Sequence, residues 1–259
     1  MTFTPGLVAL DIDGTLVDWS GQMPDEIHVA VRRVVDAGVP VVLSTGRSWW
    51  STQPVFEHLG LPDGWAICSN GAVGLSHAPT EVVFEERFDP AVTLAKVSEI
   101  APHICVAVER GLTRIANRPF PEGELGGPVE YASLEEMSAE PVCRIVLRDP
   151  GSEQDRFEAM VRQLGLHGVS YFVGWSAWLD IAPYGVDKSH GLRQVCSDLG
   201  IDRSRVLAIG DGDNDTDLLA WAGRGVALGD ANPHVKAAAD HVTGAFLDGG
   251  TAEELLRWF

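Results

Sequence analysis

Short apolar runs alternate with helical patterns at both ends of this chain, and this alternation constrains its fold more than any other feature. The apolar runs 7–12, 40–44 and 65–68 are separated by helical patterns over 24–37 and 49–59. Buried strands that alternate with helices are typical of a parallel sheet with helices on its faces. The alternation returns after Gly185, with strands expected at 206–209 and 225–228. We therefore expect an α/β fold with a Rossmann-like parallel-sheet core domain.

The middle of the chain follows a different pattern. Between 81 and 183 the expected strands follow one another closely, and two helical patterns interrupt them. These strands are expected at 82–88, 104–108, 112–117, 142–147, 169–173 and 178–182. Such a mixture predicts an α+β unit of its own. We expect residues 1–80 and 184–259 to form one core domain, interrupted by an inserted α+β cap domain over 81–183.

The composition excludes several classes of function. The chain has 37 acidic and 19 basic residues and a formal charge of −18, which argues against nucleic acid or an anionic membrane surface as a partner. Neither a signal peptide nor an apolar run long enough to span a membrane is present in the sequence. The four cysteines form no C-x-x-C pair, so we expect reduced core thiols in a cytoplasmic protein.

Two acidic runs follow expected strands directly. Asp11 and Asp13 end the first apolar run, and Asp211, Asp213 and Asp215 follow the strand at 206–209. The carboxyl ends of parallel strands meet at one edge of a sheet, where ligands bind. Carboxylates gathered there repel one another, and a divalent cation with oxygen ligands, such as Mg²⁺, relieves the repulsion. The alternative is a pair of solvated acidic loops that only cap the following helices.

Two further positions suit an anionic ligand. Thr45 and Gly46 follow the second expected strand, where a hydroxyl and exposed backbone amides could hold a phosphoryl oxygen. Lys188 opens a helix directly after the insertion, where its charge opposes the helix dipole. An ordinary turn at Thr45 and a solvated helix face at Lys188 are the alternatives.

Taken together, these motifs resemble the haloacid dehalogenase superfamily of phosphohydrolases. Asp11-Ile-Asp-Gly-Thr15 is similar to the nucleophile motif, Thr45 in Ser-Thr-Gly-Arg to the second motif, and Lys188 to the third. Gly210-Asp-Gly-Asp-Asn-Asp215 is similar to the acidic fourth motif. An insertion between the second and third motifs resembles the Cof-like sugar-phosphatase branch, subfamily IIB. Thr45-Gly-Arg47, Ser69-Asn-Gly-Ala72 and Gly-Val-Asp-Lys188 also resemble that branch.

The resemblance implies a role for each matched residue. Asp11 would attack phosphorus and form an aspartyl-phosphate, while Asp13 would act as general acid and then as general base. Mg²⁺ would be bound by Asp11, the main-chain carbonyl of Asp13, Asp211 and Asp215. The phosphoryl group would be bound by Thr45, Gly46, Lys188 and Asn214. Asp213 matches no role.

Substrate contacts are expected outside these motifs. The candidates are Arg47, Asn70, Glu109, Arg114, Arg118, Trp175, Trp178 and Asp180. Most belong to the insertion, which we expect to close over the core and exclude water. Exposed charges on strands, or aromatic side chains packed inside the insertion, are the alternative interpretation.

The resemblance implies a Mg²⁺-dependent phosphomonoester hydrolase that acts on a small phosphorylated metabolite, with a sugar phosphate as the favoured substrate. A sugar phosphomutase with a related core and cap, and a non-catalytic metabolite sensor that kept the fold, are the alternatives. Fold analogy alone does not identify the leaving group. The oligomeric state is not predicted.

Overall fold

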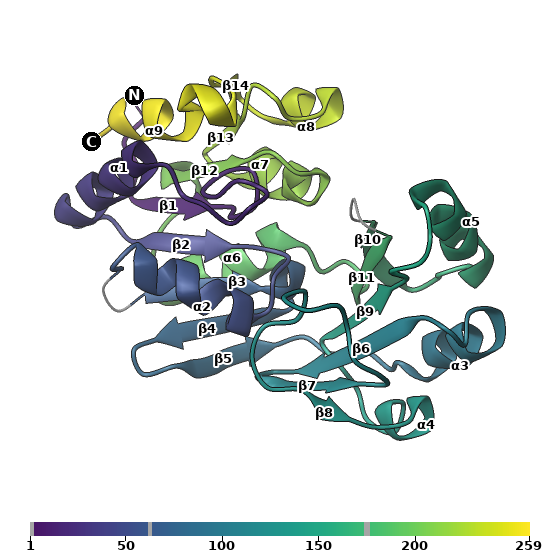
Figure 1. Ribbon diagram of the computed structural model, residues 1–259. Coiled ribbons are helices and arrows are strands. Elements are labelled where there is room, and N and C mark those ends of the chain that lie inside the picture. Colours follow the sequence, from purple (N-terminus) through teal and green to yellow (C-terminus); the bar gives the residue numbers. More distant parts are fainter. Residues whose placement is uncertain (1–2, 62–63, 174–176) are drawn as a thin grey trace. The chain divides into compact units, whose positions relative to one another are not determined.

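The chain forms two compact units in a computed structural model that describes residues 3–61, 64–173 and 177–259 (Figure 1). Met1–Val83 and Asp187–Phe259 make up the first, which we call the core unit. Phe84–Val186 make up the second, which we call the inserted unit. The first unit therefore consists of the two ends of the chain.

An eight-stranded sheet forms the centre of the core unit, in the order β14-β13-β12-β1-β2-β3-β4-β5. Its strands are β1 (Leu7–Leu10), β2 (Val41–Ser44), β3 (Gly64–Cys68), β4 (Val73–His77), β5 (Glu81–Glu85), β12 (Val206–Gly210), β13 (Arg224–Ala227) and β14 (His241–Val242). Strands β14 to β3 are parallel, and β4 is antiparallel to β3. The residues of β1, β2 and β12 are all buried, as expected for a parallel sheet covered on both faces.

Six helices accompany the strands of the core unit in the described residues. They are α1 (Asp25–Asp36), α2 (Trp49–His58), α6 (Lys188–Leu199), α7 (Thr216–Trp221), α8 (Pro233–Ala238) and α9 (Gly250–Leu256). Four of them, α1, α2, α7 and α8, connect consecutive parallel strands. Short 3₁₀ turns are η1 (Ser69–Gly71), η2 (Arg203–Arg205), η3 (Asp213–Asp215) and η4 (Phe246–Asp248). In α1 the buried residues recur three and four positions apart, so one apolar stripe packs inward: Ile27, Ala30, Val31 and Val34. The observed fold class is thus the α/β class predicted from the alternation.

The inserted unit is built around a six-stranded sheet in the order β10-β11-β9-β6-β7-β8. Its strands are β6 (Cys105–Arg110), β7 (Thr113–Ala116), β8 (Glu130–Tyr131), β9 (Arg144–Arg148), β10 (Val169–Val173) and β11 (Trp178–Pro183). Its helices are α3 (Ala91–Ile100), α4 (Leu134–Met137) and α5 (Gln154–Leu164). Side chains from α3 and α5 pack with those of β6, β9 and β11 in one apolar core.

Three further features bear on the sequence predictions. All four cysteines are buried and free, as expected for reduced core thiols. Among the described residues, the helices are too short or too polar to cross a membrane. Strand β4 was not predicted, and β5 differs from the strand expected at 82–88, because it ends at Glu85 and lies at the edge of the larger sheet. An apolar run predicts a strand without saying which sheet it joins.

Candidate active site

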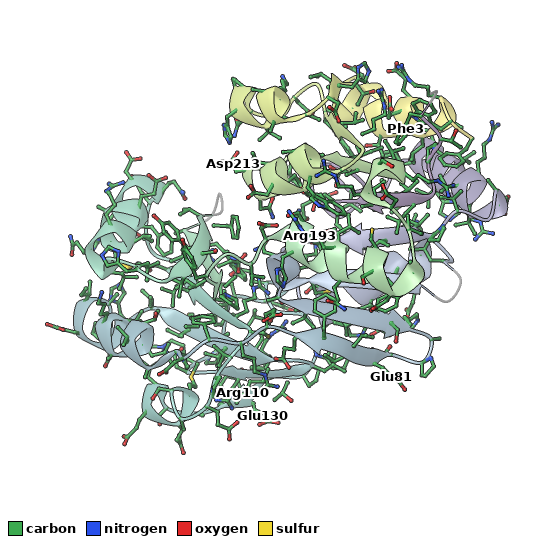
Figure 2. All side chains as sticks on the ribbon, turned by 180° about the vertical axis from the view of Figure 1, so that it is seen from behind. Phe3, Glu81, Arg110, Glu130, Arg193 and Asp213 are labelled. Atoms are coloured by element: carbon green, nitrogen blue, oxygen red, sulfur yellow. The ribbon has the colours of Figure 1, made fainter. Side chains whose placement is uncertain are left out.

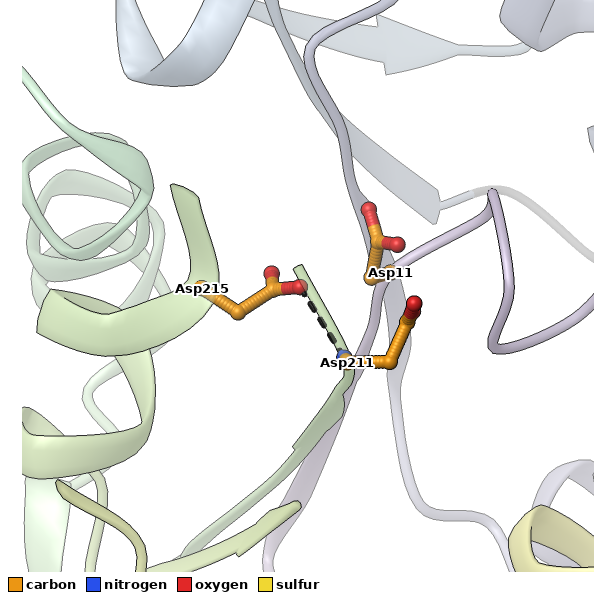
Figure 3. A group of neighbouring side chains, drawn as sticks. All are labelled: Asp11, Asp211 and Asp215. Carbon is orange, nitrogen blue, oxygen red and sulfur yellow. Dashed lines mark hydrogen bonds between the residues drawn. The ribbon is translucent and has the colours of Figure 1, made fainter. Parts of the chain in front are cut away.

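Two neighbouring parallel strands bring Asp11 and Asp211 together. Strands β1 and β12 are parallel, with Leu10 opposite Ile209, so the loops after them leave the sheet side by side. Asp11 lies in the first loop and Asp211 in the second, and Figure 3 shows their side chains beside that of Asp215. One carboxylate oxygen from each of the three lies within 4.8 Å of the others. The predicted acidic cluster therefore exists at the carboxyl edge of the sheet.

Lys188 is the cation of this cluster. Its ammonium Nζ donates to Oδ1 of Asp11 at 2.6 Å and to Oδ1 of Asp215 at 2.7 Å. The side chain is fully buried at the start of α6, where Asp187 caps the helix by accepting from the backbone N–H of His190. Two carboxylates thus offset the unfavourable position of a lysine at a helix N-terminus.

A glycine lets α6 approach this closely. Gly71 has φ +101°, and a Cβ at this position would lie 1.9 Å from the carbonyl oxygen of Asp187. Turn η1 therefore packs directly against the residue that precedes Lys188, which no larger residue would permit.

The cluster holds more negative charge than Lys188 compensates. Burial, and then the charge of Asp215, raise the pKa of Asp11 well above its usual value, although Lys188 lowers it. Burial and Asp215 also raise the pKa of Asp211, to about 7. Burial alone would lower the pKa of Lys188, but Asp11 and Asp215 raise it by more, so the ammonium stays charged. Three carboxylates around one ammonium favour a further cation.

Backbone and hydroxyl donors fix Asp211 and Asp215 of the fourth motif. The N–H groups of Asp211 and Gly212 donate to Oδ2 of Asp215 at 3.2 and 2.9 Å, the first of them drawn in Figure 3. The hydroxyl of Thr15 donates to Oδ1 of Asp211 at 2.8 Å. Gly14 has φ +80°, and a Cβ there would lie 2.3 Å from Oδ2 of Asp211. The loop after β1 therefore lies directly against the Asp211 carboxylate.

Arg47 pairs with the second aspartate of the first motif, and Thr45 contacts the backbone of Arg47. Thr45 is fully buried, and its Oγ1 accepts from the backbone N–H of Arg47 at 3.1 Å. The guanidinium of Arg47 donates to both carboxylate oxygens of Asp13, from Nε at 2.9 Å and from Nη2 at 2.5 Å. The predicted acid–base residue and a predicted substrate contact thus form a two-pronged ion pair.

Two asparagines join distant loops beside Gly46. The side-chain Nδ2 of Asn214 donates to Oδ1 of Asn70 at 2.8 Å, and Asn70 is almost completely buried. Ser69 and Asn70 both have left-handed backbone conformations, with φ values of 54° and 53°. Two consecutive non-glycine residues in this region are unfavourable and are found most often at functional sites. A Cβ on Gly46 would lie 3.0 Å from Oδ1 of Asn70, so the three residues are close neighbours.

Asp213 stands apart from the cluster, as its lack of a matched role predicts. It is labelled in Figure 2, and 63% of its side chain is exposed. Its Oδ1 lies 3.0 Å from Nε2 of His234 and accepts from Nδ2 of Asn232. Asp213 therefore provides an acidic residue in the same loop that does not touch the cluster.

The candidate residues of the inserted unit contact one another. Glu109 lies between Arg114 and Arg144, accepting from Nε of the first at 2.9 Å and from Nη1 of the second at 3.3 Å. Asp180 accepts from Nη2 of Arg144 at 2.6 Å and from Nε1 of Trp178 at 3.0 Å. We call these five residues the insert ion network. Glu109, Arg114 and Arg144 are buried, whereas Asp180 and Trp178 keep partial exposure.

Arg118 and Trp175 are the remaining candidate substrate contacts of the insertion. Arg118 donates to the carbonyl oxygens of His103 and Pro102 at 2.6 and 2.9 Å, which fixes the loop before β6. Trp175 lies outside the described residues.

Replacing Glu109 with Gln is expected to destabilise the protein by about 3 kcal/mol, because two buried arginines would lose their shared carboxylate. Burial raises the pKa of Glu109, but Arg144 and Arg114 lower it by more, so the net shift is downward. Its stabilising effect is therefore present above the pKa of an unfolded glutamate and is lost as the pH falls through the lower folded value. Urea unfolding at neutral and acidic pH would measure both effects.

The exposed Glu122→Gln is the matched control, and its stability should equal that of the wild type. A Glu109→Gln protein as stable as this control at neutral pH would contradict the prediction.

Sequence reasoning missed several partners. Arg144 joins Glu109 to Asp180, yet an arginine on a strand gave no reason to single it out. The hydroxyl of Thr15 holds Asp211, and its place directly after Asp13-Gly14 was an available signal. The pairing of Arg47 with Asp13 joins positions 34 residues apart, which spacing alone does not predict.

Comparison with known proteins identifies the family of the chain. The family model of haloacid dehalogenase-like hydrolases matches residues 8–255. A phosphoglycolate phosphatase of Aeropyrum pernix is 32% identical, over 97% of this chain and 92% of its own. A phosphoglycolate phosphatase of Natronomonas pharaonis is 30% identical, over 96% of each chain.

The fold agrees as well. A solved structure described as a subclass IIB sugar phosphatase of the haloacid dehalogenase superfamily superimposes with a TM-score of 0.82. It is 21% identical and covers 97% of this chain and 98% of its own. The chain therefore belongs to the haloacid dehalogenase-like hydrolases and is an enzyme of the phosphatase class.

Proposed function

We propose that this enzyme is a Mg²⁺-dependent phosphomonoester hydrolase that works through an aspartyl-phosphate on Asp11. The observation that carries the proposal is the state of the Asp11 carboxylate. Its Oδ1 accepts from Lys188, whereas its Oδ2 accepts no hydrogen bond from the described residues. A buried carboxylate that is held at one oxygen and open at the other suits a positioned nucleophile.

The residues present fit a divalent cation. Asp11, Asp211 and Asp215 hold oxygens within 4.8 Å of one another, and Lys188 alone leaves this cluster with excess negative charge. Hard carboxylate oxygens are the ligands that Mg²⁺ prefers. We infer that these three residues, with the main-chain carbonyl of Asp13, hold the ion. When bound, Mg²⁺ would offset negative charge on the phosphoryl oxygens.

The first half-reaction uses both aspartates of the first motif. Oδ2 of Asp11 forms a bond to phosphorus as the bond from phosphorus to the ester oxygen breaks. Asp13 gives its proton to that leaving oxygen, so the substrate departs as an alcohol. The products of this step are the alcohol, the Asp13 carboxylate and phosphorylated Asp11.

The second half-reaction restores the enzyme. Asp13 takes a proton from water as the water oxygen attacks phosphorus. The bond between phosphorus and Asp11 breaks, and inorganic phosphate leaves. Water and one phosphomonoester are consumed, and one alcohol and one phosphate are produced.

Donors around the cluster support a phosphoryl site. The Thr45 hydroxyl accepts from Arg47, and among the described residues it has no acceptor, so its own hydrogen is available to a phosphoryl oxygen. Lys188 supplies positive charge beside Asp11, and Asn214, fixed by Asn70, lies in the loop after β12. We propose Thr45, the backbone of Gly46, Lys188 and Asn214 as the groups that stabilise the transferring phosphoryl group.

We propose that the inserted unit acts as a cap that determines the substrate, and that the substrate is a small phosphorylated metabolite, favouring a sugar phosphate. The name of the solved subclass IIB relative supports a sugar phosphate. The names of the two curated relatives support a small phosphorylated acid, so phosphoglycolate belongs in the same substrate panel. Partly exposed Trp178 and Asp180 are the candidate contacts of the insert ion network.

Phosphate release from p-nitrophenyl phosphate, measured with Mg²⁺ and with a chelator, tests the proposed reaction. Release is expected only with Mg²⁺, and a panel of sugar phosphates with phosphoglycolate would then rank substrates. Release that is equally fast in excess chelator would contradict the metal dependence. Isotope-labelled phosphate that appears on another hydroxyl, and not in solution, would identify a mutase.

Gly14→Ala is expected to raise the Mg²⁺ concentration needed for half-maximal activity by roughly tenfold or more. A Cβ at Gly14 would overlap the Asp211 carboxylate, which must then move away from the proposed metal site. Titration of activity with Mg²⁺ gives the measurement.

Gly21→Ala is the matched control, because Gly21 has the same backbone conformation, φ +81°, with nothing within 4 Å of its Cβ position. Both variants carry the strain of a positive φ, roughly 1 kcal/mol. Equal Mg²⁺ requirements in the two variants would mean that backbone strain alone explains the effect, and would contradict displacement of the Asp211 carboxylate.

A further inference from the structure

We propose that Arg47 is a positioning residue for the general acid, which it holds in a fixed orientation through its two-pronged contact with Asp13. This inference rests on the proposed function, because it assigns a partner to the acid–base step. Nε and Nη2 of Arg47 reach the two carboxylate oxygens at 2.9 and 2.5 Å. Paired N–H donors that match both oxygens fix the plane of a carboxylate, which a single contact does not.

The backbone of Asp13 is already fixed, so only its side chain remains to be oriented. The N–H groups of Leu16 and Val17 donate to the carbonyl oxygen of Ile12, and that of Gly14 donates to the carbonyl oxygen of Val17. These bonds close a tight loop around Asp13. Its side chain is nevertheless 45% exposed. Within the described ranges, Arg47 is the only residue that hydrogen-bonds the Asp13 carboxylate.

Arg47 is itself anchored. Its Nη1 donates to the carbonyl oxygen of Ser51 in the first turn of α2, at 3.1 Å. Its backbone N–H donates to Oγ1 of Thr45, and its carbonyl oxygen accepts from Ser69 at 2.9 Å. Arg47 thus uses two side-chain N–H groups to hold Asp13 and a third to bind α2. Its backbone makes two further contacts, to Thr45 in the loop after β2 and to Ser69 in η1. A mobile surface arginine would not have this set of contacts.

The consequence is specific to proton transfer. A general acid accelerates the reaction only where its proton lies within hydrogen-bond reach of the leaving oxygen. Without Arg47 the exposed carboxyl group would rotate, and a poor leaving group would lose more than a good one. An arginine that only contacts substrate would instead affect good and poor leaving groups alike.

The test compares kcat/KM for two aryl phosphates of similar size. p-Nitrophenol leaves readily as an anion, whereas p-methoxyphenol needs a proton. Arg47→Met is expected to reduce kcat/KM for p-methoxyphenyl phosphate at least about tenfold more than for p-nitrophenyl phosphate. Because kcat/KM reports only the steps through loss of the leaving group, hydrolysis of phosphorylated Asp11 does not affect the comparison.

A double-mutant cycle separates positioning from substrate contact. In an Asp13→Asn background, Arg47→Met should cost less than about twofold further on p-methoxyphenyl phosphate, since the group it positions is gone. The same loss in both backgrounds would overturn the proposal. Arg47→Lys keeps the charge without the fork, so it should show the same leaving-group dependence, and it replaces Arg47→Met if that variant melts early.

Two control variants distinguish a failure of the Arg47 proposal from a failure of the proposed function. Arg32→Met, at a side chain of α1 that is 40% exposed, should leave the hydrolysis of both substrates unchanged. Asp13→Asn should itself show the leaving-group dependence, and if it does not, the acid role of Asp13 fails and the proposed function fails with it. If Asp13→Asn shows the dependence and Arg47→Met does not, only the role of Arg47 is overturned.

Discussion

Asp11→Asn is expected to reduce Mg²⁺-dependent phosphate release by roughly 10⁴-fold or more, the scale on which removal of a catalytic nucleophile acts. An amide is a far weaker nucleophile than a carboxylate, and asparagine has no second carboxylate oxygen to replace Oδ2 while Oδ1 contacts Lys188. Burial and the charge of Asp215 disfavour a charged Asp11 in the metal-free protein. The variant should therefore melt no earlier than the wild type without Mg²⁺. Single-turnover assays and thermal melts would measure both.

Asp213→Asn is the matched control, because Asp213 belongs to the same acidic edge and does not touch the cluster. It should keep wild-type turnover and the wild-type response to Mg²⁺. More than a tenth of wild-type turnover in Asp11→Asn would contradict the nucleophile assignment. Early melting of that variant would instead assign Asp11 a structural role.

Lys188→Met is expected to reduce turnover by roughly 10³-fold, because one buried ammonium holds Asp11 and, in the proposed mechanism, also stabilises the transferring phosphoryl group. The substitution also changes the charge of the metal site. Three carboxylates would remain with no cation among them, so Mg²⁺ should raise the melting temperature of the variant more than that of the wild type. Melting curves across a Mg²⁺ titration would test this charge effect separately from turnover.

Lys236→Met is a suitable control, since Lys236 donates to the carbonyl oxygen of Gly229 in a loop that does not touch the cluster. Its turnover and its Mg²⁺ response should match those of the wild type. A Lys188→Met protein with a smaller Mg²⁺ response than the wild type would mean that Lys188 helps to form the metal site, and would contradict the charge argument.

The sheet could be predicted from the sequence where burial imposes a pattern. The strands β1, β2 and β12 are buried throughout, so each appears as an apolar run followed by polar residues. Strand β4 follows two residues with left-handed backbones, which no apolar pattern announces. Strand β5 exposes Val82 and Val83, so its composition does not distinguish an edge strand of one sheet from a strand of the other.

The site was predictable to the extent that the topology determines it. Residues that directly follow parallel strands must meet at one edge, and Asp11 and Asp211 do so. Their hydrogen-bond partners depend on the directions of side chains, which the spacing of residues in the sequence does not reveal. The contact of Arg47 with Asp13 and the sharing of Glu109 by two arginines therefore appeared only in three dimensions.

The pairing of β1 with β12 has a consequence for synthesis of the chain on the ribosome. Leu7 lies beside Val206, so the strand that precedes the proposed nucleophile pairs with a neighbour that is made about 200 positions later. Lys188, Asp211 and Asp215 are all made in that late part of the chain. A nascent chain that ends before α6 thus holds Asp11 without Lys188, and one that ends before β12 still lacks Asp211 and Asp215. If the proposed site is correct, phosphatase chemistry can begin only when the last quarter or so of the protein has emerged.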